Sequence, residues 1–307
     1  MPEVQEIRRG AASRWRMVKR VVLFAMRGRM GAKLVIGYCV DPNPKLASFR
    51  LRVAIPAAHL PVPHRFGVTG SPTFFYKDGN PTLARSLRTG VIYDVVNDHF
   101  SGSRAANYHG MAAAADVLTT CSEVMREVVR RATGRDAIVI DDPYENECSP
   151  PEVSGNVVLW FGHGANISSL KPYADLPNLV ICSNVPGAIP WTPQSEADCL
   201  YGAAVVLLTG NNPGASTNRM VKALRAGRFV VTPGGVPSWE QFRDFCWIGD
   251  VNEGVRWALN NREEACLKIA AGQAYTSERF TPSLITGRWM EAFASTLGAA
   301  TSDSRGG

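Results

Sequence analysis

Short apolar runs alternate with helical patterns along most of the chain, and this alternation limits the possible folds more than any other feature. The runs LVIGYCV (34–40), TFFYK (73–77) and GVIYDVVND (90–98) are typical of buried strands, and residues 123–132 have helical periodicity. Strands that alternate with helices of this length form parallel sheets with helices on both faces. The sequence therefore predicts an α/β protein built from parallel sheets.

A polar, proline-bearing segment at 143–155 divides this pattern into two series. A chain of 307 residues suits two domains of ordinary size. We expect two Rossmann-like parallel-sheet domains that face a central cleft, where ligands bind at the carboxyl ends of the strands. The expected divisions are a basic extension at 1–33, a first domain at 34–150, a second domain at 151–275, and a C-terminal helix and tail at 276–307.

Basic residues are concentrated at the N-terminus. Residues 1–33 contain nine Lys and Arg against two Glu, a net charge of +7, whereas the remaining chain carries 24 basic and 25 acidic side chains. Such an arm is suited to nucleic acid or to an anionic membrane surface, and a solvated extension is the alternative. No run of 18 apolar residues is present, so no transmembrane segment is expected. Seven cysteines without a CxxC pattern indicate reduced thiols and a cytoplasmic protein.

Two loops of small polar residues are candidates for binding an anion. NNPGASTN (211–218) precedes the helical pattern MVKALRA, which Gly227 is positioned to end, and uncovered N–H groups at such a helix start attract phosphate. Arg219 and Lys222 lie one turn apart and are expected to approach a diphosphate, the alternative being a capped helix with two solvated cations. WFGHGANISSL (160–170) again places glycines between a strand and a helix, with Asn166 in capping range. The candidate donor-binding residues are Gly162, His163, Gly164, Asn166, Ser216, Thr217, Asn218, Arg219 and Lys222.

The order of several motifs resembles that of GT-B glycosyltransferases, in particular the large group whose donor domain carries an E-x7-E motif. The resemblance covers about residues 34–297 and rests on SFRLRV, VIYDVVNDHF, VLTTCSEVMREVV, AIVIDDPYE, VLWFGH and NRMVKALRAGRFVV. It implies a nucleotide-sugar donor, such as a UDP-sugar, whose diphosphate lies at 216–219. It also implies transfer of the sugar to an acceptor hydroxyl and a last helix that crosses back to the first domain.

The sequence departs from that family at the two glutamates, where it has Gly214 and Lys222. In the family these carboxylates usually contact the donor sugar and the ribose. A non-catalytic protein that keeps the GT-B shape and binds a nucleotide sugar is therefore the contrasting expectation.

The first domain is expected to hold the acceptor. Asp98 and His99 follow a strand and are the candidate catalytic residues, because either is suited to take the acceptor proton in an inverting reaction. Ser48, Arg50 and Lys77 are the candidate acceptor-side residues. Neither an Asp-x-Asp motif nor a Cys/His set with ligand spacing is present, so no metal and no other cofactor is expected. A modified base in DNA and a lipid or cell-envelope acceptor at a membrane both fit the basic arm.

Overall fold

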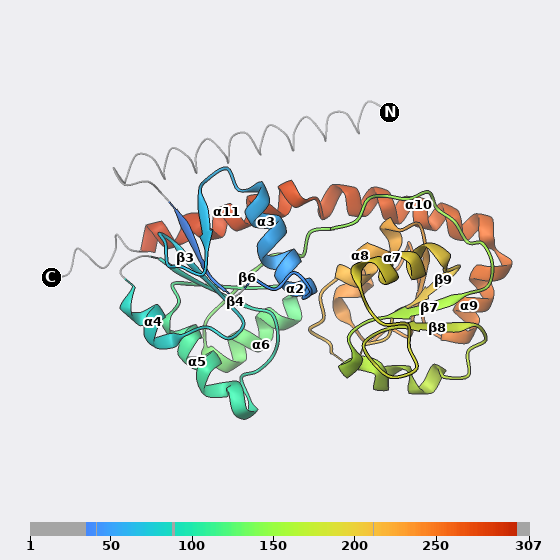
Figure 1. Cartoon of the computed structure of the whole chain (residues 1–307), viewed down its shortest axis with the longest axis horizontal. Coiled ribbons are helices and arrows are strands. Elements are labelled where there is room, and N and C mark those ends of the chain that lie inside the picture. Colours follow the sequence, from blue (N-terminus) through green and yellow to red (C-terminus); the bar gives the residue numbers. More distant parts are fainter. Residues whose placement is uncertain (1–34, 41, 88–89, 211, 300–307) are drawn as a thin grey trace. The chain divides into compact units, whose positions relative to one another are not determined.

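The computed structural model describes residues 35–40, 42–87, 90–210 and 212–299. Of residues 297–299 it describes the backbone only. The basic extension at 1–33 lies outside the described residues. The chain forms two compact units, 1–141 with 282–307, and 142–281 (Figure 1). The division between the units falls after Asp141 and after Thr281, and the helix at 282–299 belongs to the first unit. The sequence suggested divisions at 150 and 275.

The first unit contains a six-stranded sheet with the order β2-β1-β3-β4-β5-β6, and every strand pair in it is parallel. Its strands are β1 (Ile36–Cys39), β2 (His64–Phe66), β3 (Thr73–Tyr76), β4 (Val91–Val95), β5 (Val117–Thr120) and β6 (Ile138–Val139).

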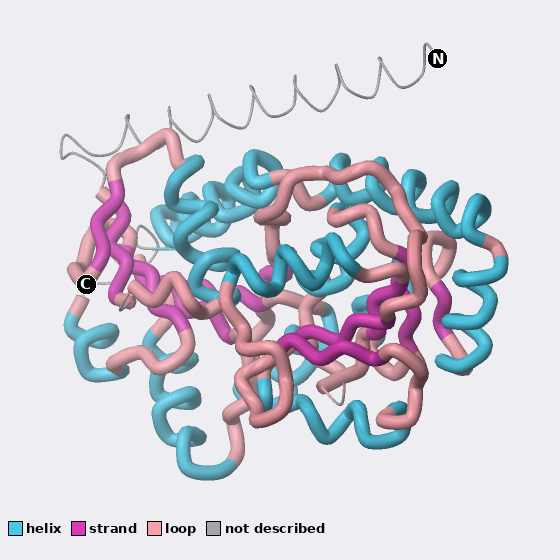
Figure 2. Tube along the Cα trace, turned by 45° about the vertical axis from the view of Figure 1, so that its right-hand side comes forward, coloured by secondary structure: helices cyan, strands magenta, loops and turns pink. Residues whose placement is uncertain are grey.

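Helices cover both faces of this sheet (Figures 1 and 2). One face packs against the helical stretch α2 (Ala47–Phe49), η1 (Arg50–Ala54) and α3 (Ile55–His59), and against α11 (Pro282–Ala299), through a core that includes Phe49, Trp289 and Phe293. The other face packs against α5 (Ala105–Ala114) and α6 (Glu123–Thr133), with α4 (Pro81–Ser86) and the short η2 (Gly102–Arg104) beside them. Burial of these aromatic and aliphatic side chains is the main source of stability.

The second unit contains a five-stranded sheet with the order β11-β10-β9-β7-β8, again with parallel pairs only. Its strands are β7 (Val158–Phe161), β8 (Leu179–Cys182), β9 (Val205–Leu207), β10 (Phe229–Thr232) and β11 (Trp247–Ile248). Its helices are η3 (Gly164–Tyr173), α7 (Pro193–Gly202), α8 (Asn218–Arg225), η4 (Pro237–Phe242), α9 (Val251–Asn260) and α10 (Arg262–Arg279). The two parallel sheets with their helices confirm the predicted α/β fold of two Rossmann-like domains.

Two short strands carry no recognisable sequence pattern. β2 lies in a proline-bearing stretch and β11 has only two residues, so neither gives a periodic signal. The candidate residue Ser48 lies inside α2, whose N-cap is Leu46. Gly227, predicted to end α8, follows that helix with a left-handed φ of 77°.

A buried ion pair joins the helix face of the first unit to the middle of its sheet. Arg52 donates from Nε and Nη2 to the two carboxylate oxygens of Asp94, at 3.0 and 2.7 Å, and the side chains are 1% and 0% exposed. Thr119 donates a further hydrogen bond to Asp94, at 2.8 Å, and the guanidinium lies over the ring of Trp289 on α11. The pair therefore connects η1, β4, β5 and the C-terminal helix, and Asp94, which the sequence placed at an open strand end, is enclosed.

Asp94→Asn is expected to lower the free energy of unfolding by about 3 kcal/mol, because it leaves the buried Arg52 guanidinium without a counter-charge. Chemical denaturation measures this loss. The control is Asp78→Asn, since Asp78 pairs with Arg104 at 3.2 Å but both side chains are about half exposed, and its loss should stay below about 1 kcal/mol. Equal losses in the two variants would contradict a structural role for the buried pair.

Candidate functional site

The second sheet has a topological switch point between β7 and β9. The chain continues from β7 to its neighbour β8 on one side, and then crosses to β9 on the other side of β7. In open parallel sheets ligands bind outside the carboxyl ends of the strands at this point. Here the ends of β7 and β9 lead into loops that contain Gly162 and Gly210. Helix α8 contributes Arg219 to the same place.

Arg219 directs its guanidinium at these two strand ends. Nη2 donates to the carbonyl oxygen of Thr209 at 3.1 Å, Nη1 donates to that of Phe161 at 3.4 Å, and the group lies 5.6 Å from the centre of the Trp239 ring. Within the described part of the chain no carboxylate forms an ion pair with it. Burial lowers the pKa of Arg219 to about 10. The charge of Glu196 opposes this effect without forming an ion pair with Arg219. A partly buried cation whose hydrogen-bond partners are all neutral is suited to an anionic ligand.

Two glycines, Gly162 and Gly210, have no side chain that would crowd the groups around the Arg219 guanidinium. A Cβ atom at Gly162 would lie 3.2 Å from Nη1 of Arg219 and equally close to the Trp160 ring. A Cβ at Gly210 would lie 3.8 Å from Nη2 and 3.2 Å from Val236. The glycines thus allow a side chain from the helix to approach the backbone of the sheet.

Thr217 precedes α8 and carries a buried hydroxyl group. The residue is 2% exposed, and its Oγ1 has no hydrogen-bond partner among the described residues. It is the N-cap of α8, yet its side chain does not cap the helix, although its carbonyl oxygen accepts from Val221 at 3.0 Å. An unpaired buried hydroxyl is uncommon and costs free energy. A ligand at the helix start would supply the missing partner, because uncovered amides at this position favour anions.

The loop after β7 supplies a further donor. Nδ1 of His163 accepts a hydrogen bond from the backbone N–H of Ala165, at 3.2 Å, so in the neutral ring the proton is on Nε2. His163 is exposed, so its Nε2–H is open to a ligand in solvent. His163 rather than Asn166 is the N-cap of η3, which begins at Gly164, so Asn166 lies inside the 3-10 helix. The other predicted residues, Ser216 and Asn218, flank Thr217, and the carbonyl of Ser216 accepts from Trp239 at 3.2 Å.

Lys222 does not share the surroundings of Arg219. Its Nζ forms ion pairs with Glu145, at 2.7 Å, and with Glu196 on α7, and all three side chains are at most 20% exposed. Burial alone would lower the pKa of Lys222, but the two carboxylates outweigh this effect and raise it. The sequence predicted that Arg219 and Lys222 approach one anion together. In the structure, Lys222 instead pairs with two carboxylates of the second unit, Glu145 and Glu196. Both lie outside the segment 211–227 that suggested the anion site.

The acceptor-side candidates all belong to the first unit. Ser48 and Arg50 follow β1, Lys77 follows β3, and Asp98 and His99 follow β4, and these three strands are neighbours. The parallel topology therefore gathers the five residues at one edge of the sheet.

Local contacts fix several of these side chains. Arg50 donates to the carbonyl oxygen of Pro44 at 2.9 Å, and Lys77 has a left-handed φ of 55°. Burial lowers the pKa of Lys77, with smaller opposing effects from nearby charges. The exposed Asp98 accepts from the N–H of Phe100 at 3.2 Å, and His99 packs edge-on against Tyr108.

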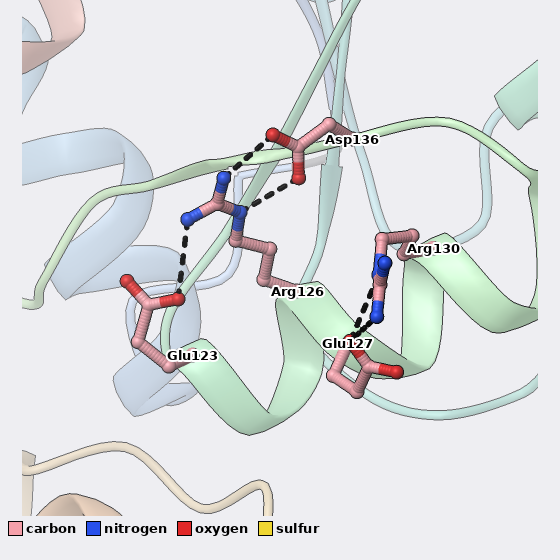
Figure 3. A pocket seen from close by; sticks show the side chains of 5 residues that line it. All are labelled: Glu123, Arg126, Glu127, Arg130 and Asp136. Atoms are coloured by element: carbon pink, nitrogen blue, oxygen red, sulfur yellow. Dashed lines mark hydrogen bonds and ion pairs between the residues drawn. The ribbon is translucent and has the colours of Figure 1, made fainter.

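A separate hollow lies on α6 of the first unit. Figure 3 shows Arg126 between Glu123 and Asp136, with Arg130 directed at Glu127. Both carboxylate oxygens of Asp136 accept from Arg126 at 2.6 Å, and these bonds hold the pKa of Asp136 at about 2. Because the charges of this hollow pair with one another, we do not assign it a ligand.

The described residues contain no group of three or more His, Cys, Asp or Glu side chains arranged to hold a metal ion. In the same part of the chain, no helix combines the length and the apolar character needed to cross a membrane.

Comparison with known proteins gives structural likeness without sequence likeness. No family model and no curated protein matches the chain. Among solved structures, Anabaena HepE in complex with UDP-glucose is similar with a TM-score of 0.62 and 13% identity, over 87% of this chain and 100% of that one. An O-GlcNAc transferase mutant from Thermobaculum terrenum is similar with a TM-score of 0.52 and 13% identity, over 89% and 69% of the two chains.

A protein from Listeria monocytogenes assigned as a UDP-N-acetylglucosamine 2-epimerase also shares the architecture, with a TM-score of 0.53 and 10% identity over 87% and 98% of the two chains. At such identities the likeness concerns the fold. Together with the two parallel sheets, it shows that this chain has a GT-B glycosyltransferase-like fold.

Proposed function

We propose that this protein transfers a sugar from a UDP-sugar to an acceptor hydroxyl. The observation that carries the proposal is the partly buried guanidinium of Arg219, whose hydrogen bonds go only to neutral groups and which lies at the switch point beside the start of α8. HepE, which shares the fold, has been solved with UDP-glucose bound. A nucleoside diphosphate has the negative charge that is suited to this position.

In this proposal the diphosphate lies against the first turn of α8. The hydroxyl of Thr217 and the amides of the helix start donate to its oxygens, and Arg219 supplies a full positive charge. Negative charge grows on the diphosphate as the sugar leaves. Donors fixed in advance stabilise that charge in the transition state without reorganising. Nε2–H of His163 is a further donor for a phosphate or a sugar hydroxyl.

The acceptor belongs, in the same proposal, to the first unit. Asp98 is exposed at the end of β4, where a carboxylate is able to take a proton from an acceptor hydroxyl, and His99 lies beside it. The net charge of +7 on residues 1–33 supports a polyanionic acceptor such as modified DNA, or an anionic membrane that carries the acceptor. Both acceptors are proposed on the charge of the arm alone.

A second candidate function is nucleotide-sugar binding without transfer. Gly214 and Lys222 stand where the resembled family has its two glutamates, and Lys222 is held by Glu145 and Glu196. Incubation with UDP-glucose separates the two functions. Release of UDP supports the transferase, whereas binding without any release supports the binding protein.

Arg219→Ala is expected to weaken UDP binding at least tenfold, because it removes the cation without a counter-charge at the helix start. Isothermal titration calorimetry measures the dissociation constant, and circular dichroism checks that the variant is folded. Arg243→Ala in the same unit is the matched control, because Arg243 is 61% exposed and pairs with Glu240. An unchanged dissociation constant in Arg219→Ala would refute the assignment of the donor site.

Thr217→Val is expected to leave the unliganded protein at least as stable as the wild type while weakening UDP binding several-fold. The substitution removes a buried hydroxyl that has no partner in the protein but has one in the proposed complex. Thr120→Val is the control, since the Thr120 hydroxyl donates to the carbonyl of Val95 at 2.8 Å, and this variant should lose about 1 kcal/mol. Thermal unfolding with and without UDP distinguishes the two. Loss of stability in unliganded Thr217→Val would mean that the hydroxyl serves the fold.

Asp98→Asn is expected to leave UDP affinity unchanged and to slow the release of UDP from UDP-glucose at least tenfold. A base that activates an acceptor hydroxyl also activates water, so donor hydrolysis reports on it. Asp78→Asn, which removes an exposed carboxylate just after β3, should react at the wild-type rate. Equal rates for wild type and Asp98→Asn would remove Asp98 from the reaction.

A further inference from the structure

Two thiols meet where α7 crosses the carboxyl end of β8. Cys182 is the last residue of β8 and is completely buried, and Cys199 is half-buried on α7. Sγ of Cys182 lies 4.0 Å from Oγ of Ser195, one helical turn before Cys199, and Cys199 packs against the hydrophobic cluster that contains Cys182. Both cysteines are free. A side chain from the strand thus faces two successive turns of the helix.

Burial makes the pair slow to react, so its oxidation requires prolonged exposure to an oxidant. Burial raises the pKa of Cys182 to about 11, and burial also raises the pKa of Cys199. At neutral pH both groups are therefore mainly thiols, which react slowly. Cys199 is the more accessible of the two and is the one that a small oxidant in solution reaches first.

An ion pair joins helix α7 to α8, the helix at the candidate donor site. Glu196, on the same helix as Cys199, accepts from Nε1 of Trp191 and forms an ion pair with Lys222 of α8. Arg219 lies one turn before Lys222. A disulfide holds its sulfurs about 2 Å apart, closer than two unbonded thiols, so bond formation changes the packing of α7 against β8. The ion pair between Glu196 and Lys222 connects α7 to α8.

We propose that Cys182 and Cys199 form an oxidative modification site, at which a peroxide closes a disulfide and thereby weakens donor binding. Hydrogen peroxide oxidises the Cys199 thiolate to a sulfenic acid and is itself reduced to water. The Cys182 thiolate then attacks the Cys199 sulfur, the S–S bond forms, and hydroxide leaves. A dithiol reductant reverses the reaction by thiol–disulfide exchange. The effect on donor binding rests on the proposed function, whereas the disulfide does not.

Peptide mapping of the full chain tests the disulfide. The protein is treated with hydrogen peroxide, remaining thiols are blocked with N-ethylmaleimide, and the denatured chain is cut after glutamate. Cuts after Glu152, Glu196 and Glu240 place the two cysteines alone on the peptides 153–196 and 197–240, and Cys148 on the peptide 148–152. We expect a cross-link between 153–196 and 197–240 that dithiothreitol removes. Its absence, or preferential linkage to other cysteines, overturns the modification site.

Titration with UDP tests the connection to the donor site. Oxidation should raise the dissociation constant at least threefold in the wild type and in Cys148→Ser, which removes an exposed thiol. Cys199→Ser, which cannot form the bond, should bind UDP equally before and after peroxide. A cross-link without a change in affinity overturns the connection. Failure of the reduced protein to bind UDP refutes the proposed function, while the peptide map still decides the disulfide.

Discussion

A guanidinium group that leaves water must replace its hydration with other dipoles or charges, and this requirement determines the site of the second unit. Arg219 obtains two carbonyl oxygens and the face of Trp239, but it forms no ion pair with a carboxylate of the described residues, and only the more distant charge of Glu196 opposes the effect of burial. Its burial therefore lowers its pKa to about 10. The glycines at the ends of β7 and β9 make room for this arrangement, and the switch in strand order brings those two ends together. The site thus follows from topology and from one incompletely compensated charge.

The buried arginine of the first unit illustrates the opposite case. Arg52 has a bidentate carboxylate in Asp94 as well as an aromatic face in Trp289. Arg52 is removed from solvent and Arg219 is partly buried. Both lie over a tryptophan ring, and both contact backbone carbonyls. They differ in whether the protein itself supplies the counter-charge. A complete pair is a structural feature, because it has no remaining affinity for an anion, whereas an incomplete one stores binding energy for a ligand.

Local patterns predicted the parts of this structure that depend on neighbours in sequence. The alternation of strand and helix patterns gave the two parallel sheets, and the position of Gly227 gave the end of α8. The partners of Arg52 and Lys222 could not be predicted in the same way. Asp94 is 42 residues from Arg52, and Glu145 is 77 residues from Lys222, so only the folded chain brings them together.

The start of α8 shows the same limit of prediction from local sequence. Small polar residues before α8 indicated an anion site, yet they did not indicate that the Thr217 hydroxyl is buried without a partner. That fact depends on how η4 and the sheet pack around residue 217.

The fold by itself does not decide between transfer and other chemistry, because a GT-B-like architecture also occurs in the protein assigned as a UDP-N-acetylglucosamine 2-epimerase. The charges near the start of α8 limit which side chain can bind a diphosphate. Lys222 stands where the resembled family has a carboxylate, but its two glutamate partners leave that group of three with a net negative charge. The replacement therefore does not add a free cation to the site, and Arg219 remains the cation without an ion-pair partner near the start of α8 within the described residues. In the proposed function a diphosphate leaving group requires such a charge whether the sugar passes to an acceptor or to water, so we expect UDP binding to depend on Arg219 whatever the acceptor is.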